Sequence, residues 1–481
     1  MNWNQEEEDN YELSLTRFEA MLKTNKVFFF DSEEFENIIL YYLDTGKSNM
    51  AKQALKLGLE QHPHSTELKL VQVEILIYDN KLDKADELLD ELELIEPTNE
   101  DIYILRANVC SKRGAHHKAV EFLTQALEYA AEDTAEIYSF LGMEYLFMDE
   151  FEKAKDNFIK CLEEDPQDYS TLYNVVYCFD FLEQHREAIE FLNWFIDENP
   201  YSEVAWHQLG VQHYELKEYE QAIRAFEYAI VIDEYFLGAY LEKAKSLEHL
   251  KRYEEAIACY NYTIELDDPT SFALHRIGRC YHKMDNKEMA VQYYYKAVQE
   301  DPLLDKAWLS IINLHIEDKN YQKALHYCGK ALDTDKENYQ YWKKYAQINE
   351  ELGDINEALT GYEKAMEHGD YELNTILALA DIYTELKNYE AAAQLLLESN
   401  NFYEYNIQIG YRLAGLYFTM GSKDNIVTGK YHLIRSIWLS ESELDCGILE
   451  DLFPKVFKRR DVQRVIKRNF KSLGENKKGW L

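Results

Sequence analysis

The sequence contains little glycine and little proline, with 18 and 7 residues respectively in a chain of 481. Together they make up about 5% of the residues, against roughly 12% in average proteins. This composition excludes a collagen-like chain and argues against a loop-rich all-β protein or a disordered one. Few residues that interrupt helices are therefore present, and a helix-rich fold is expected.

Cysteine is also scarce. The seven cysteines are widely scattered and form no CxxC pair. A structural zinc site or a disulfide framework would need closer, paired spacing. We therefore predict buried free thiols, no metal and no other cofactor.

Long apolar runs are missing, and the early run Val27–Phe30 has only four residues. A membrane-spanning helix would need about 18 or more such residues, so no transmembrane segment is predicted. The first residues, MNWNQEEEDN, lack the basic and apolar regions of a secretory signal. A cytoplasmic location is the consistent prediction.

Positive charge is in short supply as well, because 51 Lys and Arg residues face 89 Asp and Glu residues, for a net charge of −38. Such a surface repels phosphate backbones, which makes nucleic acid a poor partner for most of the chain. The 38 tyrosines, 22 phenylalanines and 7 tryptophans supply ample apolar area for a packed fold.

What the sequence does have is an internal repeat of 34 residues. In residues 271–304, numbered here as positions 1 to 34 of a reference repeat, apolar or small residues occupy positions 4, 7, 8 and 11, then 20, 24 and 27. Within each half this is the spacing of one helix face, and a polar break at residues 282–286 separates the halves. The pattern predicts a helical hairpin.

Position 20 is alanine in eleven successive copies, which lets the two helices of a hairpin approach closely. Position 8 is often small too, and position 24 is a large apolar residue in ten of the eleven copies. Four bulky residues depart from the pattern, Ile39 and Ile312 at position 8 and Leu92 and Phe195 at position 27, which affects local helix spacing but not the fold. The alanines are Ala51, Ala85, Ala119, Ala154, Ala188, Ala222, Ala256, Ala290, Ala324, Ala358 and Ala392.

This pattern resembles that of tetratricopeptide repeat (TPR) proteins over residues 32–406, about 78% of the chain. The resemblance implies an all-α, right-handed TPR superhelix, an α-α solenoid of about eleven to twelve helical hairpins with N- and C-terminal capping helices. We predict four parts: an acidic N-terminus with a capping helix (1–31), eleven repeats (32–406), a degenerate twelfth repeat (407–440) and a basic C-terminal helical segment (441–481).

The resemblance also implies that positions 2, 5, 9 and 12 of each first helix line a concave groove; we call these positions the groove stripe. Its early residues are acidic (Glu33, Glu36, Glu67, Glu74, Asp101, Glu136), its middle is aromatic and apolar, and its later part is more basic. Several tyrosines could instead pack against the next repeat. The predicted partner-binding residues are Tyr173, Tyr177, His207, Tyr214, Leu241, Lys245, His275, Arg279, Lys306, Asn313 and Lys343.

Residues 455–481 differ from the rest, because ten Lys or Arg residues face only Asp461 and Glu475, for a net charge of +8. Apolar residues between them predict a basic amphipathic helix that packs Phe457, Val465, Ile466 and Phe470 on the final repeat. The segment either caps the array or binds an anionic partner, such as RNA, a membrane surface or an acidic protein. Its basic patch comprises Lys458, Arg459, Arg460, Arg464, Lys467 and Arg468.

Motifs of catalysis are missing: the sequence has no GxGxxG, P-loop, HExxH or GxSxG pattern. His116 and His117 are interpreted as turn residues. The predicted function is a non-catalytic scaffold or adaptor that captures a peptide segment or helix of another protein in its groove, with no small-molecule substrate. An RNA- or ribonucleoprotein-associated repeat protein that uses the basic C-terminal segment is the alternative, and an enzyme with an unrecognised site is a more distant one.

Overall fold

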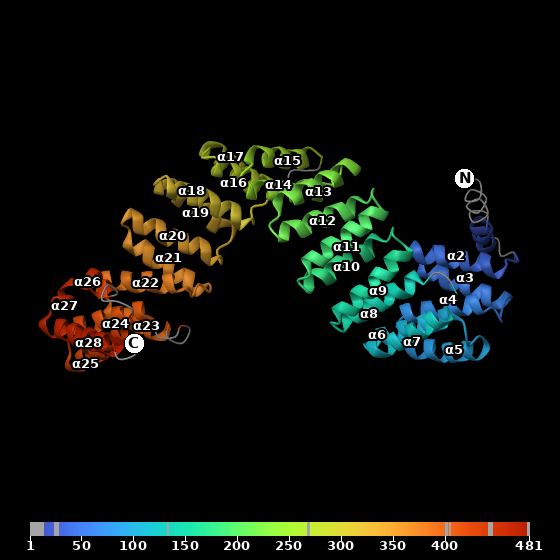
Figure 1. Ribbon diagram of the computed structural model, residues 1–481, viewed down its shortest axis with the longest axis horizontal. Helices are drawn as coiled ribbons and strands as arrows, with labels where there is room; N and C mark the ends of the chain where they lie inside the picture. The colour runs from blue at the N-terminus through green and yellow to red at the C-terminus, as the bar shows by residue number, and fades with distance from the viewer. Residues whose placement is uncertain are drawn as a thin grey trace. The chain divides into compact units, whose positions relative to one another are not determined.

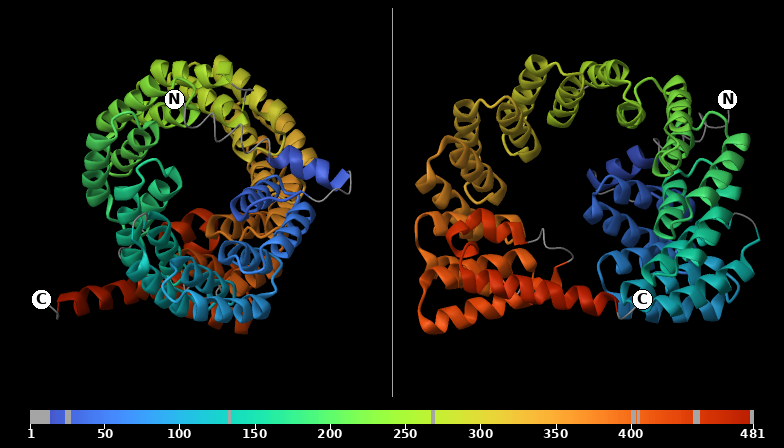
Figure 2. Two further views of the ribbon diagram at one scale, coloured as in Figure 1. Left: turned by 90° about the vertical axis from the view of Figure 1, so that its right-hand side faces the viewer. Right: turned by 60° about the vertical axis from the view of Figure 1, so that its left-hand side comes forward.

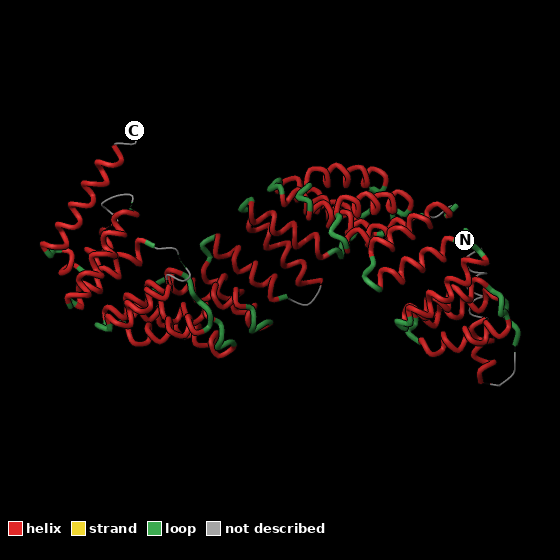
Figure 3. Tube along the Cα trace, turned by 90° about the horizontal axis from the view of Figure 1, so that it is seen from below, coloured by secondary structure: helices red, strands yellow, loops and turns green. Residues whose placement is uncertain are grey.

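The computed structural model describes residues 14–23, 28–131, 134–266, 270–399, 403, 406–440 and 446–478. Over these ranges all regular secondary structure is helical, and Figure 3 shows helices joined by short loops. The predicted all-α solenoid fold is confirmed. The predicted acidic N-terminus lies, for residues 1–13, outside the described residues. The chain divides into two compact units, Met1–Ser246 (unit 1) and Leu247–Leu481 (unit 2), which are described separately.

Each 34-residue repeat forms two helices, one beginning at position 1 and one at position 17. Within each unit the hairpins stack one after another (Figure 1, Figure 2). The first helices are α2 (Ser32–Asp44), α4 (Thr66–Tyr78), α6 (Glu100–Lys112), α8 (Ala135–Phe147), α10 (Tyr169–Phe181), α12 (Glu203–Glu215), α14 (Leu237–His249), α16 (Ser271–Lys283), α18 (Asp305–Glu317), α20 (Tyr339–Leu352) and α22 (Leu373–Glu385). The second helices are α3 (Ser48–Gln61), α5 (Leu82–Ile95), α7 (His116–Tyr129), α9 (Phe151–Glu164), α11 (His185–Glu198), α13 (Tyr219–Ile232), α15 (Tyr253–Leu266), α17 (Lys287–Glu300), α19 (Tyr321–Thr334), α21 (Ile355–Glu367) and α23 (Tyr389–Ser399).

Local sequence explains where these helices begin. Most first helices follow a short polar residue whose side chain accepts a hydrogen bond from the first turn, as Asp31 does from the Glu34 amide and Ser202 from the Ala205 amide. Second helices follow a tight turn whose position 15 has a positive φ in every repeat. That residue is glycine at Gly46, Gly114 and Gly353, and it is Asn80, Asp149, Glu183, Lys217, Lys251, Asp285, Lys319 and Lys387 in the others.

The alanines at position 20 lie at the contact between the two helices of each hairpin, and all eleven are fully buried. In three repeats the facing position 8 is a glycine covered by an aromatic ring at position 24. A Cβ added to Gly210 would lie 2.4 Å from Cε1 of Phe226, and one added to Gly142 would lie 2.4 Å from Cε1 of Phe158. In these three repeats the predicted close approach is possible because the glycine at position 8 has no side chain.

Bulky residues at positions 8 and 27 separate the helices. The pairs α10–α11, with Val176 and Phe195, and α4–α5, with Val73 and Leu92, approach each other over fewer residues than α12–α13 does. Hairpins α2–α3 and α18–α19, which have Ile39 and Ile312 at position 8, are intermediate. The departures noted in the sequence thus change the spacing inside a hairpin while the hairpin remains.

Both ends of the array are covered by further helices. Helical residues 14–23 place Phe18 and Met21 in the core formed with Phe35 of α2. After α24 (Ile407–Met420) and α25 (Lys423–Leu439) the chain forms α26 (Gly447–Leu452), α27 (Pro454–Phe457) and α28 (Arg460–Lys478).

Helix α28 packs against α25, with Val462 and Ile466 buried. Phe457, Val465 and Phe470 lie against the same core, as predicted. The single helix predicted over 455–470 is instead interrupted at Lys458 and Arg459. The Arg459 side chain donates to the Phe418 carbonyl (3.2 Å) and pairs with Asp461 at the start of α28, which ties the interruption to α24.

Deletion of residues 459–481 is expected to lower the stability of α24 and α25. It would remove Val462 and Ile466 from the core that includes Leu433 and Ile437 of α25. Hydrogen exchange should rise at least ~10-fold in α24 and α25, while α2 to α8 exchange as before, because stability in repeat arrays is local. Unchanged exchange in α25 would show that α28 contributes nothing to the fold.

Candidate functional site

The acidic part of the groove stripe comes together in unit 1. The pKa of Glu74 is raised, first by loss of hydration between the neighbouring helices and then by the charges of Asp101, Glu36 and Glu136. Glu36 has a raised pKa for the same reason, with Glu67 as its main charged neighbour. Carboxylates of α2, α4, α6 and α8 thus act on one another across four repeats; we call Glu36, Glu67, Glu74, Asp101 and Glu136 the acidic cluster.

The acidic cluster belongs to the more negative half of the chain. Unit 1 has 52 acidic and 21 basic residues, whereas unit 2 has 37 and 30, so their formal net charges are −31 and −7. A positively charged ligand would therefore be attracted chiefly by unit 1.

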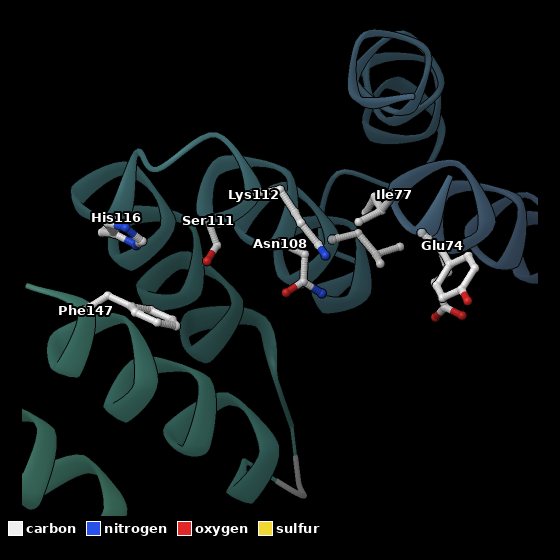
Figure 4. A pocket seen from close by; sticks show the side chains of 9 residues that line it. Glu74, Ile77, Asn108, Ser111, Lys112, His116 and Phe147 are labelled. Atoms are coloured by element: carbon white, nitrogen blue, oxygen red, sulfur yellow. The ribbon is translucent and has the colours of Figure 1, made fainter. Parts of the chain in front are cut away.

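A pocket of about 660 Å³ opens beside the acidic cluster. Figure 4 shows Glu74 at one end, His116 and Phe147 at the other, and Asn108 and Lys112 between them. The His116 ring stacks on Phe147, and its Nδ1 lies 2.9 Å from the buried Glu144 carboxylate. The remaining lining residues are Ile77, Tyr78, Leu105 and Ser111.

Aromatic residues continue the surface along α10. Tyr173 and Tyr177 are exposed on successive turns of this helix, as expected for the groove stripe. Beyond them Phe181 is exposed too, and its ring stacks on Phe151 with centroids 3.6 Å apart. We call the exposed residues Phe147, Tyr173, Tyr177 and Phe181 the exposed aromatic surface. Of these, Phe147 lines the pocket beside the acidic cluster.

Four other predicted residues of unit 1 are less accessible. His207 lies between the rings of Phe226 and Phe236, and within the described residues neither of its ring nitrogens has a hydrogen-bond partner. Tyr214 contacts Tyr219, and Lys245 is paired with Glu242 at 2.6 Å. Leu241 is half-buried on α14.

In unit 2 two of the four predicted basic residues meet acidic residues of their own unit. Lys343 lies 2.6 Å from Glu372, and Arg279 lies 3.5 Å from Glu248. His275 is buried, with its Nε2 3.1 Å from the Ser310 hydroxyl. Lys306 is exposed, and Asn313 is half-buried. The later groove stripe is therefore much less positive than its sequence indicated.

The basic patch of the C-terminal segment lies mainly on the outer side of α28. Lys458, Arg460, Arg464, Lys467 and Arg468 are exposed, whereas Arg459 is half-buried through the contacts given above. Within the ranges that the structure covers, no three His, Cys, Asp or Glu side chains are grouped as metal ligands would be. Over the same ranges, no helix combines the length and apolar character needed to cross a membrane.

Selecting residues by type alone missed part of this surface. Ile77, Asn108 and Ser111 occupy positions 9 and 12 of their repeats and line the pocket, yet none is charged or aromatic. Phe147 and Phe181 lie at position 13, one residue beyond the groove stripe. Applying the positional rule to every repeat and extending it by one residue would have found them.

Comparisons with known proteins match these repeats. One tetratricopeptide repeat family model matches residues 100–133, 135–168 and 273–302. A second tetratricopeptide repeat model matches residues 207–269. A 99-residue stretch, 19% of the chain, is 31% identical to the transcription activator GutR of Bacillus subtilis (strain 168). The chain spans only 12% of the length of that protein.

Several solved structures are similar to parts of the chain. A crystal structure of MamA protein is 25% identical, covers 35% of this chain and 92% of its own, and has a TM-score of 0.32. The C-terminal part of a TPR repeat-containing protein from Cytophaga hutchinsonii is 17% identical over 50% of this chain and 99% of its own, with a TM-score of 0.42. The Cut9-Hcn1 tetramer structure of APC/C is 16% identical over 86% and 94%, with a TM-score of 0.34.

The family matches fall on hairpins whose helices begin at the same two positions throughout the array. Repeats of this family serve in general as scaffolds for protein interactions. The chain contains tetratricopeptide repeats.

Proposed function

We propose that the protein is a non-catalytic scaffold that captures a peptide segment or helix of a partner protein along the groove stripe. The part that carries this proposal is unit 1, where the acidic cluster, the pocket and the exposed aromatic surface adjoin. The partner segment that suits it is basic and has an apolar residue to place near Phe147. In this proposal residues 32–406 act as eleven repeats, 407–440 as a degenerate twelfth, and the segments 1–31 and 441–481 close the array.

Two physical effects support this assignment. The net charge of −31 accelerates the approach of a basic segment, and this effect weakens as salt rises. Flat aromatic side chains such as Tyr173 and Tyr177 then slow its departure, since large rigid side chains dominate binding energies at interfaces.

Replacing Tyr173 and Tyr177 together by alanine is expected to weaken partner binding ~10-fold or more. Both side chains are exposed on α10, so the free energy of unfolding should change by less than ~0.5 kcal/mol. The measurement is affinity capture from native lysate read by mass spectrometry, followed by titration of the captured protein.

A matched control replaces Tyr201 and Tyr235 by alanine. Both are also exposed tyrosines of unit 1, but they lie in the turns between repeats and off the groove stripe. Captured proteins should be retained by the wild type and the control and lost by the α10 variant. Equal capture by all three proteins would place the binding surface elsewhere.

The exposed basic residues of α28 support a second candidate, an RNA-associated function. Treating the lysate with nuclease distinguishes the RNA-associated function from direct protein binding. Partners that disappear after nuclease and after charge reversal at Arg464 and Lys467 would favour RNA. Partners that survive nuclease would favour direct protein binding.

A further inference from the structure

Helix α25 has an exposed apolar side in addition to the side that packs on α24 and α28. Its buried residues are Gly429, His432, Leu433, Ser436 and Ile437. On the other side Val427 is 68% exposed, Tyr431 55%, Ile434 36% and Trp438 52%. We call these four residues the α25 seam.

The other repeats show how unusual the α25 seam is for this protein. If Gly429 is aligned with the alanine of position 20, the α25 seam occupies positions 18, 22, 25 and 29 of a second helix. In each of the eleven repeats at most one of these four positions is apolar, as with Leu94 in α5 and Val231 in α13. Helix α25 is therefore the exception, because all four of these positions are apolar in it.

The spacing and the flanking charges of the α25 seam identify the kind of partner. Its residues are separated by four, three and four positions, which is the a/d spacing of a two-stranded coiled coil rather than the wider face of a membrane-surface helix. Lys430 and Arg435 then fall at the flanking g and e positions. Arg435 donates a hydrogen bond to the Tyr431 hydroxyl at 3.2 Å, which places this charge beside the seam.

We propose that the α25 seam pairs with a helix of a partner protein that has apolar residues at the same spacing and acidic residues at the flanking positions. A second copy of this chain does not satisfy this requirement, because its own α25 seam is flanked by Lys430 and Arg435 and offers no acidic residue at the e and g positions. The site is separate from the groove stripe, so either proposal can fail alone.

The test uses the full-length protein and two labelled three-heptad peptides with leucine at a and d, one with glutamate and one with lysine at e and g. Fluorescence anisotropy should show binding of the glutamate peptide at least ~10-fold tighter than that of the lysine peptide. The charge-swapped variant Lys430→Glu/Arg435→Glu should reverse this preference.

Trp438→Ser/Tyr431→Ser should abolish binding of the glutamate peptide, whereas Leu94→Ser and Val231→Ser, which alter exposed apolar residues of other second helices, should leave it unchanged. Circular dichroism checks that each variant is folded. Failure of the glutamate peptide to bind, or equal binding of the two peptides, would overturn the proposal. So would a Trp438-dependent dimer in light scattering, or Trp438-dependent binding to phosphatidylserine vesicles, without peptide binding.

Discussion

Replacing Gly210 by alanine is expected to destabilise unit 1 by about 1–3 kcal/mol. In an ordinary helix the same change stabilises, by up to ~1 kcal/mol, because alanine is the better helix former. Here the new Cβ would lie 2.4 Å from the Phe226 ring, which is fully buried and has no room to move away. Overpacking therefore outweighs helix propensity, and hydrogen exchange of α12 and α13 should rise.

Gly329→Ala provides the matched control. Gly329 also lies inside a helix, α19, but a Cβ there would meet nothing within 4 Å. This variant should gain up to ~1 kcal/mol of stability. If Gly210→Ala lowers the free energy of unfolding and Gly329→Ala raises it, the loss is caused by the contact with the Phe226 ring.

A compensating substitution tests the same contact in a second way. Two repeats combine alanine at position 8 with leucine at position 24, namely Ala107 with Leu123 and Ala380 with Leu396. Phe226→Leu should therefore recover part of the stability lost in Gly210→Ala, with a coupling of about 0.5–3 kcal/mol in a double-mutant cycle. Additive losses would mean that the two residues do not oppose each other.

Acidification from pH 7 to pH 5 is expected to destabilise unit 2 at two buried histidines. Burial lowers the pKa of His275 to about 4, helped by Arg279, Arg276 and Lys306, and burial with Arg435 lowers that of His432 to about 4. The unfolded chain takes up protons near pH 6.5, and the folded chain does so only near pH 4. Stability is therefore lost as pH falls between these values, about 2 kcal/mol for each histidine by pH 5.

Protection factors of α16 and α25 amides, corrected for intrinsic exchange rates, measure this loss. His275→Gln should flatten the pH dependence of the protection factors in α16 and leave that of α25 unchanged. His64→Gln, at an exposed histidine, is the control for removing an imidazole. Near α2 and α4 the raised pKa values of Glu36 and Glu74 give a change of opposite sign, since folding there favours proton uptake. Buried His207 of α12, whose pKa is lowered, acts in the same direction as His275. A loss of protection at α2 and α4 like that at α16 would contradict this assignment.

Much of the fold could be predicted because a single packing rule recurs every 34 residues. The alanine at position 20 and the small residue at position 8 determine which faces of two helices meet. The polar capping residues and the turns at position 15 determine where the helices begin. The rule also explains the departures from the pattern. Helices α10 and α11, with the bulky Phe195 at position 27, approach each other over fewer residues than α12 and α13 do. The interruption before α28 was not predicted, because it depends on a contact between Arg459 and the distant Phe418 carbonyl.

The candidate site could be predicted only in outline. Position along a helix indicates which residues share a side, and Tyr173 and Tyr177 are exposed there. Position does not indicate which charges are already paired, since the partner of Lys343 is Glu372 in the turn before the next repeat. Ion pairs between repeats depend on side-chain reach, which the repeat pattern does not contain.

The left-handed residue at position 15 gives the array an uneven distribution of strain. Between Gly114 and Gly353, six successive turns use Asp149, Glu183, Lys217, Lys251, Asp285 and Lys319 for a backbone conformation that glycine adopts without cost. Each such turn lowers the stability of its own hairpin by up to ~1 kcal/mol relative to glycine, and neighbouring repeats are affected only through their shared interfaces. All six residues are exposed, so replacing one of them by glycine can raise the stability of its own hairpin without changing the buried contacts between the helices.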